Sequence, residues 1–158
     1  MNSNTQNDSL SNIDVNTFTV ENVMDYLKQE GYYPEIDEFD SRVIIFKFQD
    51  ETISIVVQSD FCKCVTSWAI NVDRNDVNAI KDAIQVVNNK LLHIIQLWEY
   101  DTDTIVFDIE HRVTSIEQFK QIFKPILELA IQCQKLFLDE YVKITGTPMH
   151  IDRKSVVK

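Results

Sequence analysis

The segment from Asn75 to Leu92 constrains the fold of this chain more than any other stretch of its sequence. Apolar residues recur in it at every third or fourth position, as they do along the buried face of a helix. These residues are Val77, Ile80, Ile84, Val87 and Leu91. Asn75 is placed to cap the amino end of the helix through its side-chain oxygen. Because strand-like segments lie on both sides, we expect the helix to bury this face against a sheet.

Four segments before that helix alternate apolar and polar residues, as antiparallel strands with one solvated face do. They cover residues 32–39, 42–48, 52–59 and 62–72. Pro34 has no backbone N–H to donate, so the first of these strands is predicted to lie at a sheet edge. An amphipathic helix precedes them, with Thr19 as its expected cap and Gly31 as its expected left-handed stop.

A hairpin follows the central helix. Residues 93–100 and 104–111 have the composition of two strands, and the polar turn Asp101–Asp103 joins them. The predicted order of elements is therefore α-β-β-β(-β)-α-β-β-α. This order indicates an α+β fold in which helices pack on an antiparallel sheet.

The last helix has a clear start signal. Thr114 or Ser115, followed three residues later by Glu117 or Gln118, forms a capping-box pattern. Pro125 lies inside the apolar periodicity that follows and deprives the helix of one internal hydrogen bond. We therefore expect a kink in the turn that precedes Pro125.

The 158 residues are enough for one domain with a proper core. Residues 1–16 contain too little apolar surface to offset the entropy of ordering, so we expect a disordered lead there. Residues 17–143 carry the periodic patterns and form the predicted single domain. Residues 144–158 lose the periodicity and become basic, which predicts a mobile tail.

The net charge of −10 limits the partners that this chain can bind. Such a charge repels a phosphate backbone, so we expect no nucleic-acid partner. Only 2 glycines occur, which excludes the glycine-rich phosphate loops of nucleotide-binding proteins. An acidic excess usually serves solubility, and it would also complement a basic partner segment.

The apolar runs and the cysteines indicate a cytoplasmic protein. No run approaches the ~20 apolar residues that span a bilayer, and the amino terminus lacks the basic start and apolar core of a signal peptide. We therefore expect no membrane contact. The 3 cysteines are an odd number, which favours free thiols in a reducing compartment.

The sequence carries no catalytic signature. Cys62 and Cys64 lack the two-residue turn of zinc knuckles and thioredoxin-like motifs, so we predict buried thiols. His93 and His111 lie at strand ends, where hydrogen-bonded or exposed imidazoles are expected. The acidic residues around the hairpin match no calcium-binding loop. We predict no catalytic residue, no metal and no cofactor, and a protein that is not an enzyme.

Five residues are candidates for a structural or a binding role. Asn88 falls beside the buried stripe, where an amide without partners costs roughly 1 to 3 kcal/mol. We interpret Asn88 and Asn89 as a structural junction at the end of the helix. Trp98 and Tyr100 share a strand face with Ile94, while the opposite face is also apolar. We predict that Ile94, Trp98 and Tyr100 contact a protein partner.

Residues 86–109 combine a helix that ends in asparagine with a strand, an acidic turn and a hydrophobic return strand, in the sequence VVNNKLLHIIQLWEYDTDTIVFDI. This combination, together with the order of elements, resembles the YbjN-like domain and its structural relatives, the type III secretion chaperones. The resemblance spans about Thr19 to Tyr141, and Pro125 in the last helix departs from it.

Proteins of this kind are non-enzymatic and often dimeric. They hold unfolded segments of secreted partners on their surface or have a regulatory role. The resemblance therefore implies a secretion-chaperone-like fold and a chaperone-like or regulatory adaptor. Its partner would be a basic or unfolded protein segment, held on the sheet face or edge by strand addition.

Two alternatives remain open. The first is a small ligand-binding domain or enzyme of α+β fold, which would show a pocket lined by His93, His111 and acidic residues. The second is a purely structural homodimer. A flat apolar surface would favour the protein-binding module instead.

Overall fold

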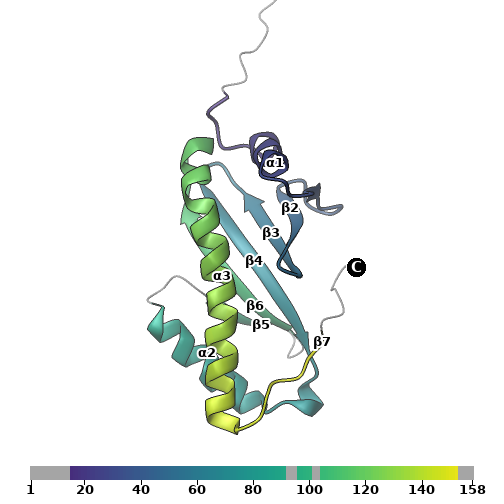
Figure 1. Cartoon of the computed structure of the whole chain (residues 1–158), viewed down its shortest axis with the longest axis vertical. Helices are drawn as coiled ribbons and strands as arrows, with labels where there is room; N and C mark the ends of the chain where they lie inside the picture. Colours follow the sequence, from purple (N-terminus) through teal and green to yellow (C-terminus); the bar gives the residue numbers. More distant parts are fainter. Residues whose placement is uncertain (1–14, 92–95, 101–103, 153–158) are drawn as a thin grey trace, which may run out of the picture.

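The computed structural model describes residues 15–91, 96–100 and 104–152, and for residues 96–100 it describes the backbone. In this part of the chain, helices pack on one face of an antiparallel sheet (Figure 1). The elements are α1 (Val20–Gln29), β1 (Glu35–Ile36), β2 (Val43–Phe48), β3 (Glu51–Val57), β4 (Phe61–Ile70), the 3-10 turn η1 (Val72–Arg74), α2 (Val77–Lys90), β5 (Gln96–Tyr100), β6 (Thr104–Arg112), α3 (Ile116–Thr145) and β7 (Ile151–Asp152). This order confirms the predicted α+β fold.

Strand β4 is the centre of the sheet. The strands follow one another in the order β1-β2-β3-β4-β6-β5, and β7 also pairs with β4. On one side, β4 pairs with β6 along its length from Phe61 to Ala69. On the other side it pairs with β3 through residues 62–65 and with β7 through residues 69–70. Strand β1 lies at an edge, as Pro34 predicts.

The hairpin between β2 and β3 fixes the register of this part of the sheet. Gln49 and Asp50 both have positive φ, 48° and 66°, which is the conformation of a two-residue turn whose twist matches the flanking strands. Phe48 consequently lies opposite Glu51, and Ile44 lies opposite Ile55. Both isoleucines are buried.

The ends of α1 agree with the sequence signals. The Thr19 side chain accepts a hydrogen bond from the backbone N–H of Asn22, and Gly31 follows the helix with a φ of 89°. For α2 the predicted cap is wrong by one residue, because Asp76 caps the helix by accepting from the backbone N–H of Ala79. The Asn75 side chain instead bonds to the backbone of His150, near the carboxyl end of the chain.

The Asn75 side chain bonds twice to the backbone of His150. Its Nδ2 donates to the His150 carbonyl at 2.9 Å, and its Oδ1 accepts from the His150 N–H at 2.8 Å. Shortly after, Ile151 and Asp152 pair with Ile70 and Ala69 of β4. The prediction that the fold ends at Lys143 is therefore wrong, because the chain contributes a strand as far as Asp152. Residues 153–158 lie outside the described part.

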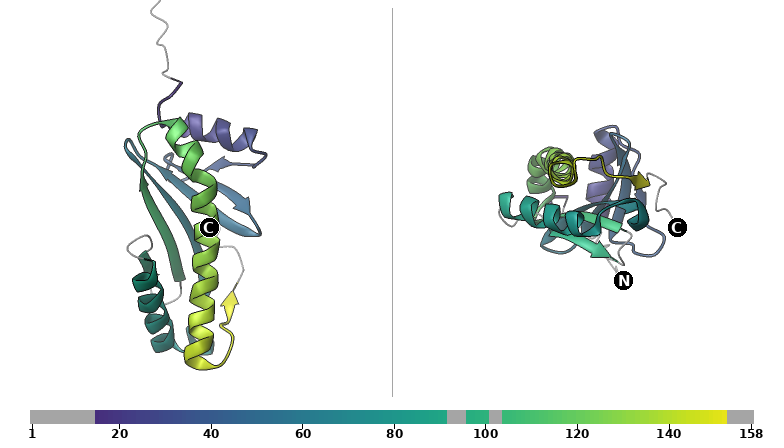
Figure 2. Two further views of the ribbon diagram at one scale, coloured as in Figure 1. Left: turned by 60° about the vertical axis from the view of Figure 1, so that its left-hand side comes forward. Right: turned by 90° about the horizontal axis from the view of Figure 1, so that it is seen from below.

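Helix α3 is the longest element and runs along the sheet (Figure 2). The Ser115 hydroxyl accepts from the backbone N–H of Gln118, so Ser115 caps the helix, and the Gln118 side chain accepts from the backbone N–H of Thr114, one residue before the cap. The helix continues past the exposed Pro125 without interruption and ends at Gly146, which has a φ of 73°. Its 30 residues extend over about 45 Å.

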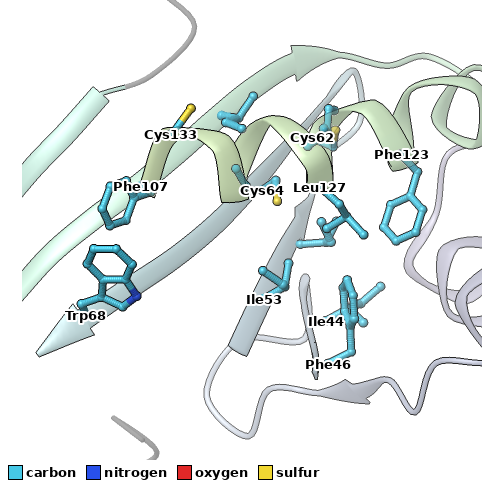
Figure 3. Packing of buried hydrophobic residues seen from close by; sticks show 14 of the residues in the cluster. Ile44, Phe46, Ile53, Cys62, Cys64, Trp68, Phe107, Phe123, Leu127 and Cys133 are labelled. Atoms are coloured by element: carbon cyan, nitrogen blue, oxygen red, sulfur yellow. The ribbon is translucent and has the colours of Figure 1, made fainter. Parts of the chain in front are cut away.

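The core lies between the sheet and the helices. Figure 3 shows that side chains from β2, β3, β4 and β6 meet those of α3 there. Phe123 of α3 is fully buried, and four rings lie with their centroids 5.3 to 6.0 Å from its own: those of Tyr26, Tyr32, Phe46 and Phe119. Such tilted and edge-on contacts add to the free energy of burial. Phe123 therefore joins α1, β2 and α3.

Replacing Phe123 by alanine is expected to lower the free energy of unfolding by about 3 to 5 kcal/mol, because it leaves a cavity among four rings. Gln132→Ala is the control, since Gln132 is exposed on the same helix and its removal should change stability by less than about 0.5 kcal/mol. Urea unfolding followed by tryptophan fluorescence measures both values. Equal stability of the two variants would contradict this account of the core.

Candidate functional site

The face of the sheet that points away from the core is open. We call it the outer face and define it by residues of β2, β3, β4 and β6 that alternate with buried ones. Every one of its described side chains is partly or fully exposed. Its apolar members are Val43, Ile45, Val56, Phe61, Val65, Ala69 and Val106. The opposite face, by contrast, is buried under helices.

The register brings these apolar residues close together. Val43 lies directly opposite Val56, and Ser54 lies between Ile45 on one side and Val65 on the other. Directly opposite residues of antiparallel strands share a face and have Cβ atoms about 5 Å apart. The β-branched side chains of β2, β3 and β4 thus lie close together on the outer face, separated by Ser54 and by Lys63, which lies opposite Val56.

One charged cluster lies among these apolar side chains. Lys63 Nζ of β4 lies 2.8 Å from Glu110 Oε1 and 2.9 Å from Asp108 Oδ2, both on β6. Hydrogen bonds to these two carboxylates raise the pKa of Lys63. The cluster carries one more negative than positive charge. Sequence reasoning missed it because the three residues meet only through the β4–β6 register, which places Lys63 opposite Glu110.

The predicted partner-binding residues fall partly within the described chain. Trp98 pairs with Val106, and Tyr100 pairs with Thr104. Since paired residues share a face, positions 98 and 100 belong to the outer face of β5, the strand at the end of the sheet. Ile94 lies outside the described residues. The binding role of all three stays a prediction.

The predicted junction lies at the carboxyl end of α2. Asn88 Oδ1 is buried and has no hydrogen-bond partner among the described residues, whereas Asn89 is exposed. Lys90 forms an ion pair with Glu140 of α3, which joins the end of α2 to α3. Hydrogen bonds from Lys90 and then Lys143 lower the pKa of Glu140. The described contact at this end of α2 is thus the Lys90–Glu140 ion pair, and the junction role of Asn88 and Asn89 stays a prediction.

The cysteines lie in the core. Cys62 and Cys64 point to the buried face of β4, and Cys133 lies on α3 above it (Figure 3). Burial raises the pKa of each of the three thiols to about 12. A thiol with such a pKa is protonated at neutral pH and is a poor nucleophile and metal ligand.

The described residues hold no cluster of three or more histidine, cysteine or acidic side chains placed to bind a metal. His111 is exposed, with its Nδ1 3.0 Å from the carbonyl oxygen of Arg112. A surface depression of about 170 Å³ lies between α1 and α3 and is lined by Tyr26 and Lys120 among others. Small-molecule sites are usually larger than this, about 300 Å³ or more. His93 lies outside the described residues.

Large apolar side chains are exposed at the other edge of the sheet. Tyr33, Ile36 and Phe39 flank or belong to β1 and extend into solvent. The sequence predicts a longer strand there, over residues 32–39, whereas the structure pairs only Glu35 and Ile36 with β2. Pro34 and the surrounding acidic residues are the signals that this segment is more exposed than an ordinary strand.

No helix in the described residues is long and apolar enough to cross a membrane.

No family model and no curated sequence matches this chain. Among solved structures, an uncharacterized protein from Methanothermobacter thermautotrophicus superposes with a TM-score of 0.53 and 14% identity, over 77% of this chain and 97% of that one. YbjN from E. coli, for which a role in transcription regulation has been suggested, gives 0.51 and 12%, over 80% and 90% of the two chains. At these identities the likeness concerns the fold alone: the chain has a YbjN-like fold.

The native protein is expected to incorporate no iodoacetamide at neutral pH, because all three thiols are buried and have pKa values of about 12. After unfolding in urea, all three cysteines should react. Mass spectrometry of the intact protein counts the added groups. Labelling of folded protein at Cys62 or Cys64 would contradict the structural role of these thiols.

Asn88→Asp is expected to lower the free energy of unfolding by about 1 to 3 kcal/mol, because it places a carboxylate oxygen at a buried position where no described residue offers a partner. Asn89→Asp is the matched control. It adds the same charge at the same helix end, but at an exposed position. Thermal and urea unfolding compare the two variants, and the junction is misplaced if they lose the same stability.

Proposed function

We propose that this protein is a non-enzymatic protein-binding module, a chaperone-like or regulatory adaptor. It holds an extended segment of a partner protein on the outer face of the sheet or along the edge formed by β5. The three free, buried cysteines suit a reducing compartment, and we place the function in the cytoplasm.

The open outer face carries this proposal. A sheet whose one face is packed by helices usually presents polar side chains on the other face. Here the other face carries Val43, Ile45, Val56, Val65 and Val106, all partly exposed. Partly exposed apolar side chains on an open sheet face are typical of a place where another protein binds, and here they lie among polar residues such as Ser54 and Lys63.

The edge at β5 supports binding by strand addition. Strand β5 pairs with β6 on one side and has no strand on its other side in the described chain. An extended segment can pair with such an edge through its backbone while its alternate side chains contact the sheet face. Positions 98 and 100 lie in β5, where they would meet the bound segment.

The charge of the protein favours a basic partner segment. The net charge is −10, and the cluster of Lys63, Asp108 and Glu110 on the outer face retains a negative charge. Complementary charge raises the rate of association and the selectivity for one partner more than it raises the affinity. A second copy of the chain is the alternative occupant, and it would make the protein a structural homodimer.

A pull-down from cells that carry the protein tests this proposal, with chemical cross-linking to place the bound segment. Wild-type protein is expected to retain a partner, and Trp98→Ala should lose it, because truncating a central aromatic residue commonly costs about 2 kcal/mol or more. Cross-links should join the partner to residues near the outer face.

Val142→Ala is the matched control, since Val142 is 41% exposed on α3, away from the sheet edges. This variant should retain the same partner as the wild type. If Trp98→Ala retains that partner too, the binding face is misplaced. If a second copy alone is recovered, and sedimentation shows a dimer, the homodimer is the better account.

A further inference from the structure

We propose that the segment from Tyr33 to Phe39, at the free edge of β1, is a second docking site and that it takes an extended segment of another protein rich in arginine or lysine. This edge lies at the opposite end of the sheet order from β5. The inference therefore does not depend on the function proposed for the β5 edge, and it can fail or hold separately.

The exposure of the aromatic residues is the first observation. Tyr33 is 92% exposed and Phe39 is 83% exposed, and Ile36 between them is 48% exposed. Single exposed apolar residues are common on protein surfaces. Three lie within seven residues here, two of them aromatic rings almost wholly in solvent, and a partner that covers this segment would remove that apolar area from water.

The backbone that presents these rings is held in place. Tyr32, the neighbour of Tyr33, packs its ring 5.1 Å from that of Phe46 and 5.7 Å from that of Phe123, and Pro34 on the other side is buried. Tyr33 is thus fixed between two anchored residues and turned to the solvent. A preformed surface loses little conformational entropy when it binds.

A turn fixes the other end of the segment. The Asp37 side chain accepts hydrogen bonds from the backbone N–H groups of Phe39 and Asp40, both at 2.9 Å. Such a turn around an aspartate side chain is a stable local structure. The turn therefore fixes the backbone at Phe39, whose side chain is 83% exposed.

The charge of the segment identifies the partner. Two nearby carboxylates are already neutralised, because Glu30 pairs with Lys124 at 3.0 Å and Asp40 with Arg42 at 2.7 Å. Glu35 and Glu38 are exposed and form no ion pair with any described residue. The patch therefore combines aromatic faces with unpaired carboxylates, and both attract the cationic side chains of arginine and lysine.

Strand addition determines which side chains of the bound segment meet this site. Glu35 and Ile36 of β1 pair with Ile45 and Ile44 of β2, and the other side of β1 has no strand neighbour among the described residues. Side chains of an added strand alternate between the two faces. A segment in which cationic and aliphatic residues alternate would place the cations at the carboxylates and aromatic rings and the aliphatic groups toward Ile36.

A second copy of this chain fits the patch less well. Isologous pairing of two β1 edges would bring Glu35 and Glu38 of one copy close to the same residues of the other. Like charges at that distance oppose association. A basic segment gains from the same carboxylates, so it is the favoured occupant.

Fluorescence anisotropy with a short labelled peptide, in which arginine alternates with valine, tests the inference on the full chain. The wild type should bind the peptide, and added salt should weaken binding because the contacts involve exposed charges. The double variant Tyr33→Ala/Phe39→Ala should bind about tenfold more weakly, since it loses both aromatic faces. Glu35→Gln/Glu38→Gln should also bind more weakly and show less dependence on salt.

Val142→Ala/Ile144→Ala is the matched control, because it removes two other exposed apolar side chains, which are 41% and 45% exposed on α3. It should bind the peptide as the wild type does, and all variants should unfold at the wild-type temperature. Three outcomes overturn the inference: no binding by the wild type, equal binding of a peptide with glutamate in place of arginine, or a loss of binding in Trp98→Ala in place of the β1 variants. Self-association that is lost in Tyr33→Ala/Phe39→Ala would assign this edge to a second copy instead.

Discussion

The fold depends on the strict alternation of side chains along β4. Cys62, Cys64, Trp68 and Ile70 point into the core, while Lys63 and its neighbours at alternate positions point to the outer face. Because β4 pairs with β3, β6 and β7, a slip of β4 by one residue would turn its own buried side chains outward and misalign it with all three neighbours. The same alternation creates the division between a helix-covered face and an open one, on which the proposed binding function rests.

Local signals made most of the fold predictable. Thr19 and Gly31 bound α1, and Ser115 starts α3, because caps and left-handed glycines act within a few residues of the sequence. Two features needed long-range contacts. Asp76, in place of Asn75, caps α2, since Asn75 is occupied by the backbone of His150. Strand β7 has only two residues and is positioned by its pairing with β4, so no periodic pattern in the sequence predicts it.

The candidate sites were less predictable from the sequence than the fold. Alternation indicated that one sheet face is exposed, but the cluster of Lys63, Asp108 and Glu110 depends on the β4–β6 register, which the sequence does not state. Pro34 and the acidic residues around it indicate an exposed segment, but they do not decide that the rings of Tyr33 and Phe39 face the solvent. An aromatic residue next to a proline is as compatible with a packed strand as with a solvent-facing one, and only the neighbouring contacts decide between the two.

The place of β4 in the chain also governs the order in which the protein can fold. The hairpin β2–β3 and its contact with β4 involve neighbours in sequence, so they can form early. The partners on the other side and at the far end of β4 come much later, with Ile105 opposite Trp68 and Ile151 opposite Ile70. During synthesis on the ribosome, β4 therefore stays half-paired until β6 has been made, and its far end waits for β7, which follows α3; β4 is thus a segment that needs protection from aggregation in that interval.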